Sequence, residues 1–187
     1  MKESNIQLSE KESLDIVSNV SDVDVYQRRI KMDSLETAML EFDQVDIPVE
    51  HLFNGDIYCR KIMIPKGTLL TGRIHKFDHF DVMISGDITV STDTGETKRL
   101  SGFNLMKGYA GKKRAGYAHE DTHWMTFHSA EERDPEQMYE FLTCGSFDEL
   151  NDFNIMLEKA INRIEEDKRI LTECANTIIK DKESLCQ

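Results

Sequence analysis

The sequence contains little of what membrane, secreted or low-complexity proteins need. Three prolines and ten glycines among 187 residues exclude collagen-like and low-complexity chains. No run of 18 apolar residues occurs, and the first 17 residues lack the basic start and apolar stretch of a secretory signal. We therefore expect neither a membrane span nor export, and we expect the protein to stay in the cytoplasm in which it is made.

The few cysteines are too far apart for a zinc knuckle or a disulfide framework. Cys59, Cys144, Cys174 and Cys186 form no C-x-x-C pair, and such spacing favours reduced thiols. Familiar enzyme signatures are also missing, because there is no nucleophile elbow, Walker loop, Rossmann glycine fingerprint or H-E-x-x-H motif. Their absence leaves an enzyme of another class open.

Negative charge is concentrated at the two ends of the chain. The formal charge is -12, with 12 acidic against 5 basic residues in 1–50, 13 against 12 in 51–145, and 10 against 6 in 146–187. Nucleic acid attracts a basic protein face, so binding of nucleic acid by the whole chain is not expected. Acidic ends are typical of solvated helix faces, whereas the nearly neutral middle allows a local basic pocket.

Residues 1–45 carry a helical pattern. Ser9 and Glu12 form a capping box ahead of a short apolar stripe, which predicts a first helix. A second helix is expected over residues 33–42. Its apolar face is predicted to consist of Leu35, Ala38, Met39 and Phe42.

Residues 46–145 change to the pattern of short strands and tight turns. Turn signals occur at residues 65–67, 85–87, 93–95 and 108–111. Intervals of about 8–12 residues between turns are typical of an antiparallel sandwich or barrel. Ile88 and Val90 alternate with Thr89 and Ser91, which predicts one buried face in that strand. We therefore expect a β domain that closes on itself.

Residues 146–187 are predicted to form one long amphipathic helix. Asp167 and Lys168 interrupt the second apolar row that a coiled coil requires, so two interpretations stay open. The helix either packs on its own barrel or associates with another copy. Its apolar residues recur at intervals of seven, at Leu157, Ile164, Leu171, Ile178 and Leu185. The predicted parts are thus an N-terminal helical segment (1–45), a β-barrel (46–145) and a C-terminal helix (146–187).

Residues 67–86, GTLLTGRIHKFDHFDVMISG, resemble the first motif of the cupin superfamily, G-x5-H-x-H-x3,4-E-x6-G. The resemblance implies that the metal-binding positions of this motif fall on Arg73, His75 and His79. The second cupin motif, P-x-G-x2-H-x3-N, matches in part at residues 114–123, and its ligand histidine falls on His119. The implied fold is an antiparallel cupin or jelly-roll barrel. The expected class is therefore α+β and mainly β, with N-terminal helices before the barrel and one long helix after it.

Three stretches also resemble small cupin-like proteins of tailed bacteriophages over residues 45–143. They are IPKGTLLTGRIHKFDHF, KKRAGYAHEDTHWMTFH and IYCRKIMIP. This resemblance implies a viral protein in the cytoplasm of the host cell, but it brings no catalytic residues. Cupins often form dimers through their strands, so the resemblance further implies a homodimer or a larger homo-oligomer.

Arginine stands where the cupin pattern has its first histidine, and this changes the expected ligand. A protonated guanidinium is no metal ligand, so Arg73 disfavours the ordinary four-ligand cupin site. Strand alternation places Arg73 and His75 on one face. These donors favour an anionic small molecule or nucleotide, with no cofactor needed. The predicted ligand-binding residues are Arg73, His75, His79, Arg114, His119, Trp124 and His128.

Three functions stay open on the sequence alone. The first is a non-enzymatic phage protein that captures the anion, for example to counter a host defence signal. The second is an enzyme in which His75, His79 and His119 hold a divalent metal with one open position. The third is a structural or interaction protein that contacts a host protein through its terminal helices. In that case the arginines would pair with Asp78, Asp81 or Asp121.

Overall fold

The structure is a computed structural model that describes residues 4–20, 25–92, 96–129 and 134–185. It divides into two units, Met1–Phe147 and Asp148–Gln187. The first unit contains the strands and the helices α1 (Glu10–Asn19), α2 (Val25–Met39) and α3 (Pro135–Leu142). The second unit contains α4 (Phe147–Leu185) from its second residue onward, since Phe147 belongs to the first unit.

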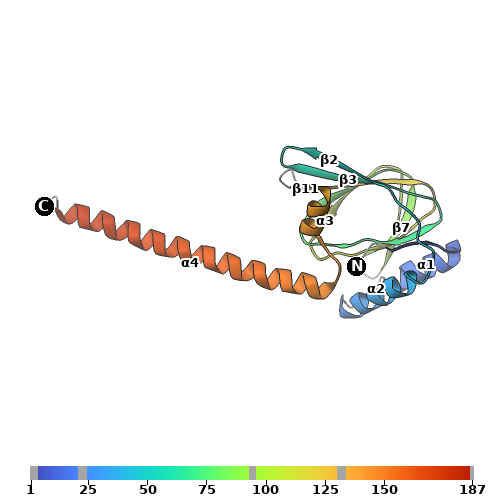
Figure 1. Cartoon of the computed structure of the whole chain (residues 1–187), viewed down its shortest axis with the longest axis horizontal. Helices are drawn as coiled ribbons and strands as arrows, with labels where there is room; N and C mark the ends of the chain where they lie inside the picture. The colour runs from blue at the N-terminus through green and yellow to red at the C-terminus, as the bar shows by residue number, and fades with distance from the viewer. Residues whose placement is uncertain (1–3, 21–24, 93–95, 130–133, 186–187) are drawn as a thin grey trace. The chain divides into compact units, whose positions relative to one another are not determined.

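Two five-stranded antiparallel sheets form the barrel of the first unit (Figure 1). One has the order β1 (Ser4–Gln7), β4 (Thr68–Thr71), β10 (Ala115–Ala118), β7 (Asp87–Ser91) and β8 (Thr97–Ser101). The other has the order β2 (Val49–Asn54), β3 (Ile57–Ile64), β11 (Thr122–Ser129), β6 (His79–Ser85) and β9 (Asn104–Gly108). A separate antiparallel pair joins β5 (Ile74–His75) to β12 (Thr143–Cys144). The predicted class, mainly β with flanking helices, is confirmed.

The apolar core between the sheets is built by alternating residues of both. Ile62 and Met83 from the second sheet pack with Ile88 and Val90 from the first. The chain passes from β6 to β7 through Gly86, whose φ of 115° favours glycine. Any side chain at this turn would also collide with the β11 backbone at residue 122. The turn signal at 85–87 therefore marks the crossing between the sheets, and the turn signal at 93–95 lies outside the described residues.

The prediction that residues 1–45 are helical was wrong in part. Residues 4–7 form β1, an edge strand paired with β4, and the capping box of Ser9 and Glu12 then starts α1 as predicted. Helix α2 starts earlier than expected and ends at Met39, so Phe42 lies beyond it and is 50% exposed. Among the side chains of α2 that the structure describes, from residue 27 onward, the buried ones are Met32, Glu36 and Met39.

Helices α1 and α2 cover the outer face of the first sheet (Figure 1). Strand β7 is therefore buried on both faces, and the prediction of one buried face was wrong there. Ile88 and Val90 face the barrel interior, whereas Thr89 and Ser91 are buried on the helix side. The alternation of apolar and polar residues did not reveal the second buried face, because polar side chains can be buried where they form hydrogen bonds. Ser91 Oγ, for example, accepts a hydrogen bond from the amide of Ala115.

A buried ion pair fixes α2 to the barrel. Lys113 Nζ lies 2.6 Å from Glu36 Oε2, and the two side chains are 2% and 3% exposed. Thr71 Oγ1 also donates to Glu36 Oε1 at 2.9 Å. Because a buried charge without a partner is costly, each member of this pair holds the other in place.

The outer face of the second sheet exposes apolar side chains. The strand register gives one row of Leu52, Cys59, Phe127, Phe80 and Lys107 and a second row of Glu50, Lys61, Met125, Val82 and Leu105. Phe80 is 49% exposed and Leu105 is 61% exposed. The charged side chains of these two rows thus lie on β9 and on the neighbouring strands β2 and β3, and the positions on β11 and β6 are apolar.

The region predicted as β between residues 46 and 145 also contains a helix. Asp134 caps α3 and Pro135 occupies its first turn, which is a common start signal that the turn-spacing argument overlooked. Tyr58 at the end of β3 packs against Met138 and Leu142 of α3. Cys59 and Cys144 are buried free thiols, whereas Cys186 and the side chain of Cys174 lie outside the described residues.

The C-terminal unit is a single long helix, as predicted. Leu157, Ile164 and Leu171 are 41%, 54% and 68% exposed, whereas the side chains of Ile178 and Leu185 lie outside the described residues. Arg169 pairs with Glu166 and Glu173 on the helix surface. Self-association through this helix stays a prediction. Every described helix is too short or too polar to cross a lipid bilayer.

Candidate functional site

The space between the two sheets contains a cavity of about 120 Å³. For comparison, an engineered apolar cavity of roughly 150 Å³ accommodates benzene. Among the residues that the structure describes, one carboxylate, that of Asp81, lines this cavity. The basic side chains in the lining are Arg60, Arg73, Lys112 and Arg114. The lining therefore carries an excess of positive charge.

Asp81 is the centre of the polar network inside the cavity. Its Oδ2 lies 3.0 Å from Arg114 Nη1 and 3.5 Å from His79 Nε2. Its Oδ1 accepts from Trp124 Nε1 at 3.1 Å and from Thr126 Oγ1 at 3.2 Å. Burial by itself would raise the pKa of Asp81, but the hydrogen bond and charge of His79 and the charge of Arg114 lower it to about 2. The carboxylate is therefore ionised at neutral pH.

Three histidine rings stack beside this network. His75 on β5 lies 3.9 Å from His79 and 5.2 Å from His128 on β11, measured between ring centroids. His75 Nδ1 is 3.3 Å from His128 Nε2. Burial and the neighbouring histidines lower the pKa of His75 well below 6.5. Burial, followed by the charge of His79, lowers the pKa of His128 to about 4. His75 and His128 are therefore neutral imidazoles at neutral pH.

A glycine on the neighbouring strand holds the His79 ring in its place. Gly108 pairs with His79 across β9 and β6, and a Cβ built on this glycine would overlap the imidazole. The φ of Gly108 is not positive, so the glycine provides space and not an unusual backbone conformation. The ring therefore lies flat on the strand and leaves the cavity open.

Arg73 is oriented by residues that follow the barrel strands in the sequence. Its Nε donates to Thr143 Oγ1 at 2.9 Å, and its guanidinium lies 4.6 Å from the centroid of the Tyr139 ring. Pairing of β12 with β5 brings Thr143 opposite His75. Tyr139 and Thr143 were missed by the sequence analysis, because nothing local links them to a residue about 70 positions earlier.

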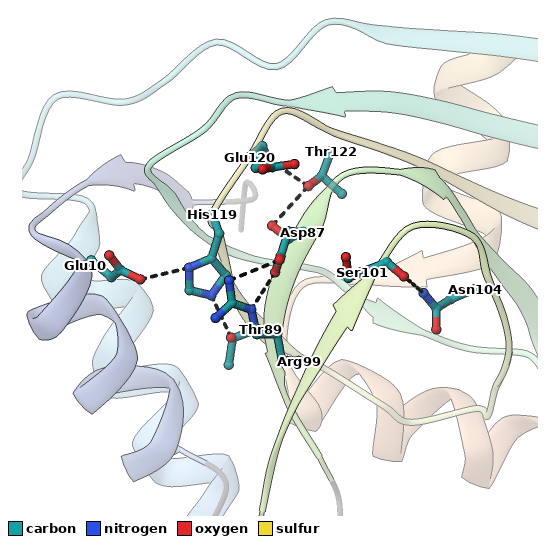
Figure 2. Close-up of polar contacts among 9 residues, drawn as sticks. All are labelled: Glu10, Asp87, Thr89, Arg99, Ser101, Asn104, His119, Glu120 and Thr122. Carbon is teal, nitrogen blue, oxygen red and sulfur yellow. Dashed lines mark hydrogen bonds and ion pairs between the residues drawn. The ribbon is translucent and has the colours of Figure 1, made fainter.

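His119 does not join the other histidines, and its predicted place in the metal site was wrong. Tyr117 of β10 packs in the cluster that β10 forms with α1 and α2, so His119, two residues later, points to the same helix side. Its Nδ1 lies 3.0 Å from Glu10 Oε1 on α1, and its Nε2 lies 2.8 Å from Thr89 Oγ1, as Figure 2 shows. His119 therefore ties α1 to the outer side of the first sheet, and His128 takes its place beside His75 and His79.

Five of the other six predicted side chains meet in one place, whereas His128 does not line the cavity. Arg73, His75, His79, Arg114 and Trp124 all line the cavity. Lys112, Arg60 and the central role of Asp81 were missed as parts of the site. The place of Arg60 could have been predicted from the sequence. Arg60 is two residues before Ile62 on β3, so both side chains lie on the inward face of this strand.

Acid is expected to destabilise the metal-free protein between about pH 6.5 and pH 4. In this range the unfolded chain protonates His128 and the folded protein does not, so the free energy of unfolding falls as the pH falls. A pKa of about 4 instead of 6.5 corresponds to a loss on the order of 3 kcal/mol. This loss of stability is measured by urea unfolding of the wild type and of His128→Gln at both ends of this pH range, in the presence of a chelator. An equally steep pH dependence in the variant would contradict the assignment.

No protein-family model and no curated protein matches this sequence. Similar solved structures include a cupin superfamily protein from Desulfitobacterium hafniense, at 11% identity over 50% of this chain and 86% of that chain, with a TM-score of 0.40. A cupin domain of an XRE family transcriptional regulator from Enterobacter cloacae has 20% identity over 46% and 98%, with a TM-score of 0.38. An acetylacetone dioxygenase from Acinetobacter johnsonii has 10% identity over 44% and 59%, with a TM-score of 0.38.

The architecture of this chain can be stated from its own strand order. Two facing antiparallel sheets enclose a core and a cavity, β1, α1 and α2 precede the other strands in the sequence, and α4 follows them. The protein thus has the mainly β fold of two facing antiparallel sheets with flanking helices that its sequence predicted.

Proposed function

We propose that the protein binds a small anion in the barrel cavity and does not transform it. The observation that carries this proposal is the charge of the lining, which contains four basic residues and one carboxylate residue. The chain as a whole has a formal charge of -12, so this local positive charge runs against its composition. Charges interact more strongly in a protein interior than at a surface, and an anion would balance the excess.

The arginines are arranged for binding before a ligand arrives. Arg114 is held by Asp81, and Arg73 is held by Thr143 and Tyr139. A planar guanidinium matches the geometry of a carboxylate or a phosphate. Side chains that are already ordered lose little conformational entropy on binding, which favours affinity.

Isothermal titration calorimetry with acetate, inorganic phosphate and acetamide tests the proposal. We expect saturable binding of one anion per chain for acetate, phosphate or both, and none for acetamide, which has the shape of acetate without its charge. Binding that weakens as sodium chloride is added would support a charged site. Equal binding of acetate and acetamide, or no saturable binding of either anion, would overturn it.

A second candidate, a metal-dependent enzyme, is favoured by the geometry of the histidine cluster. The ligand atoms of His75, His79 and His128 lie within 4.8 Å of one another. The 3.3 Å between His75 Nδ1 and His128 Nε2 is close to the roughly 3.4 Å expected between two nitrogens on a tetrahedral zinc. His79 Nδ1 donates to the carbonyl of Phe77 at 3.1 Å, as metal-binding imidazoles commonly do to a second partner.

These residues fit a divalent metal, because neutral imidazoles are the form that binds one. A bound metal would supply a Lewis acid and an activated water. In this candidate function His75, His79 and His128 would hold the metal, and the Phe77 carbonyl would orient His79 through Nδ1.

Replacing His128 distinguishes this metal site, which contains His128, from the site that the sequence motif implied, which contains His119. We expect His128→Gln to lower the affinity for Zn²⁺ at least about tenfold, because it removes a nitrogen ligand. His119→Gln is the matched control and is expected to leave the affinity unchanged, since His119 contacts Glu10 and Thr89. Calorimetry with Zn²⁺ measures both variants. A loss in His119→Gln equal to that in His128→Gln would contradict the assignment.

We also propose that the apolar outer face of the second sheet pairs with a second copy of this chain. A two-fold axis along β11 would place Phe127 and Met125 against their own counterparts. The same axis brings the β9 edge of one copy to the β2 edge of the other, so that Lys107 faces Leu52 and Leu105 faces Glu50. The apolar centres of the two copies therefore meet, which is the pattern of a self-complementary interface.

Light scattering with size-exclusion chromatography tests this pairing. Phe80→Glu is expected to convert a dimer to a monomer, because it places a carboxylate in the apolar centre of the face. Phe42→Glu is the matched control, since Phe42 is 50% exposed and Phe80 is 49% exposed. A monomeric wild type, or a dimer that survives Phe80→Glu, would overturn the pairing. A phage origin, a role against host defence and contacts of the terminal helices with a host protein stay predictions.

A further inference from the structure

The barrel interior is divided into a polar layer and an apolar layer. On the second sheet the register aligns Arg60, Thr126 and Asp81 in one row across β3, β11 and β6. The next inward row along the same strands consists of Ile62, Trp124 and Met83. A step of two residues along each strand therefore changes the lining of the barrel from charged to apolar side chains.

The first sheet continues the apolar layer. Leu70, Gly116 and Val90 are aligned across β4, β10 and β7, and all three line the cavity. A Cβ on Gly116 would approach the Ile88 side chain to 3.2 Å and that of Leu70 to 3.5 Å. The missing side chain therefore lets the apolar side chains of Ile88 and Leu70 pack against the β10 backbone.

The size of the cavity limits what this layered lining can hold. A volume of about 120 Å³ is somewhat smaller than the roughly 150 Å³ that accommodates benzene. A short branched chain with one charged group matches this space, and a single ring with one charged group is at its upper limit. A nucleotide, with a base, a sugar and a phosphate, is several times larger and does not.

Building on the proposed anion site, we infer that its ligand class is a monocarboxylate with a compact apolar body. The carboxylate lies against the arginines of the polar layer, Arg60, Arg73 and Arg114. The body lies between Ile62, Val90 and Trp124. Burial of apolar surface then adds to the charge attraction, so the body contributes affinity that a bare anion lacks.

The single tryptophan of the sequence reports on this cavity, because Trp124 lines it. Its fluorescence can be titrated with three probes: benzoate, acetate and benzamide. Benzoate has the charge and the ring, acetate has the charge alone, and benzamide has the ring without the charge. We expect benzoate to bind at least about tenfold more tightly than either of the other two.

A pair of isosteric variants locates the ring within the barrel. Val90→Thr keeps the shape of the side chain but places a hydroxyl in the apolar layer, and we expect it to weaken benzoate about fivefold or more. It is expected to leave acetate unchanged. Val82→Thr makes the same replacement on the outer face of β6 and is expected to leave both probes unchanged.

The outcomes distinguish this inference from the anion proposal on which it rests. Equal affinity for benzoate and acetate, or an unchanged affinity for benzoate in Val90→Thr, would overturn the apolar body and leave the anion site standing. Benzamide that binds as tightly as benzoate would overturn the anion site. A lack of saturable change with all three probes, checked by calorimetry, would overturn both.

Discussion

Replacing Lys113 by methionine is expected to lower the free energy of unfolding by about 3–5 kcal/mol. The reason is the burial of its partner, because Glu36 is 3% exposed in its side chain and would keep a negative charge without a cation beside it. Thr71 donates one hydrogen bond to the carboxylate but supplies no charge. Urea unfolding followed by circular dichroism measures the change.

Two controls separate the buried pair from ion pairs in general. Lys61 pairs with Glu50 at 2.7 Å, but these side chains are 35% and 54% exposed, so Lys61→Met is expected to cost less than about 1 kcal/mol. The double variant Glu36→Met/Lys113→Met removes both charges and is expected to recover most of the loss. If Lys113→Met cost no more than Lys61→Met, the pair would not fix α2 to the barrel as described.

Replacing Arg73 by glutamine is expected to weaken anion binding at least about thirtyfold, because truncating one partner of a buried charged hydrogen bond costs on the order of 2 kcal/mol or more. Thr143 and Tyr139 orient Arg73 at the lining of the cavity, where its guanidinium can pair with the anion. Calorimetry uses whichever of acetate and benzoate binds the wild type more tightly.

Arg99→Gln is the matched control for this replacement. Arg99 is 60% exposed and pairs with Asp87 at 2.8 Å, on the side of the first sheet that also carries His119 (Figure 2). We expect it to leave the affinity unchanged, since Arg99 does not line the cavity. An Arg73→Gln protein that binds like the wild type would remove Arg73 from the site.

Much of the fold could be predicted because its signals are local. The capping box at Ser9 and the turn signal at Gly86 each involve only a few neighbouring residues, and both occur where they were expected. The strand β1 was not predicted, because it forms at the sheet edge by pairing with β4, more than 60 residues later. Local pattern carries no information about such a partner.

The residues of the candidate site could be predicted only where the alternation of side chains along a strand decides which face of the sheet they occupy. Arg73 and His75 are two residues apart and do share the cavity lining. His119 failed the same test, because it comes two residues after Tyr117 and lies with it on the helix side. The ion pair of Asp81 with Arg114 links residues that are far apart in sequence, so local pattern left three acidic partners and no means of choosing among them.

Native mass spectrometry, with elemental analysis of the same sample, tests the central claim most directly. The protein is purified without a histidine tag, and its mass is compared before and after denaturation. The account predicts a metal-free chain that carries one small anionic adduct, which is absent in Arg73→Gln. One equivalent of zinc, iron, manganese or nickel per chain and no anion would contradict it and would favour the three-histidine metal site.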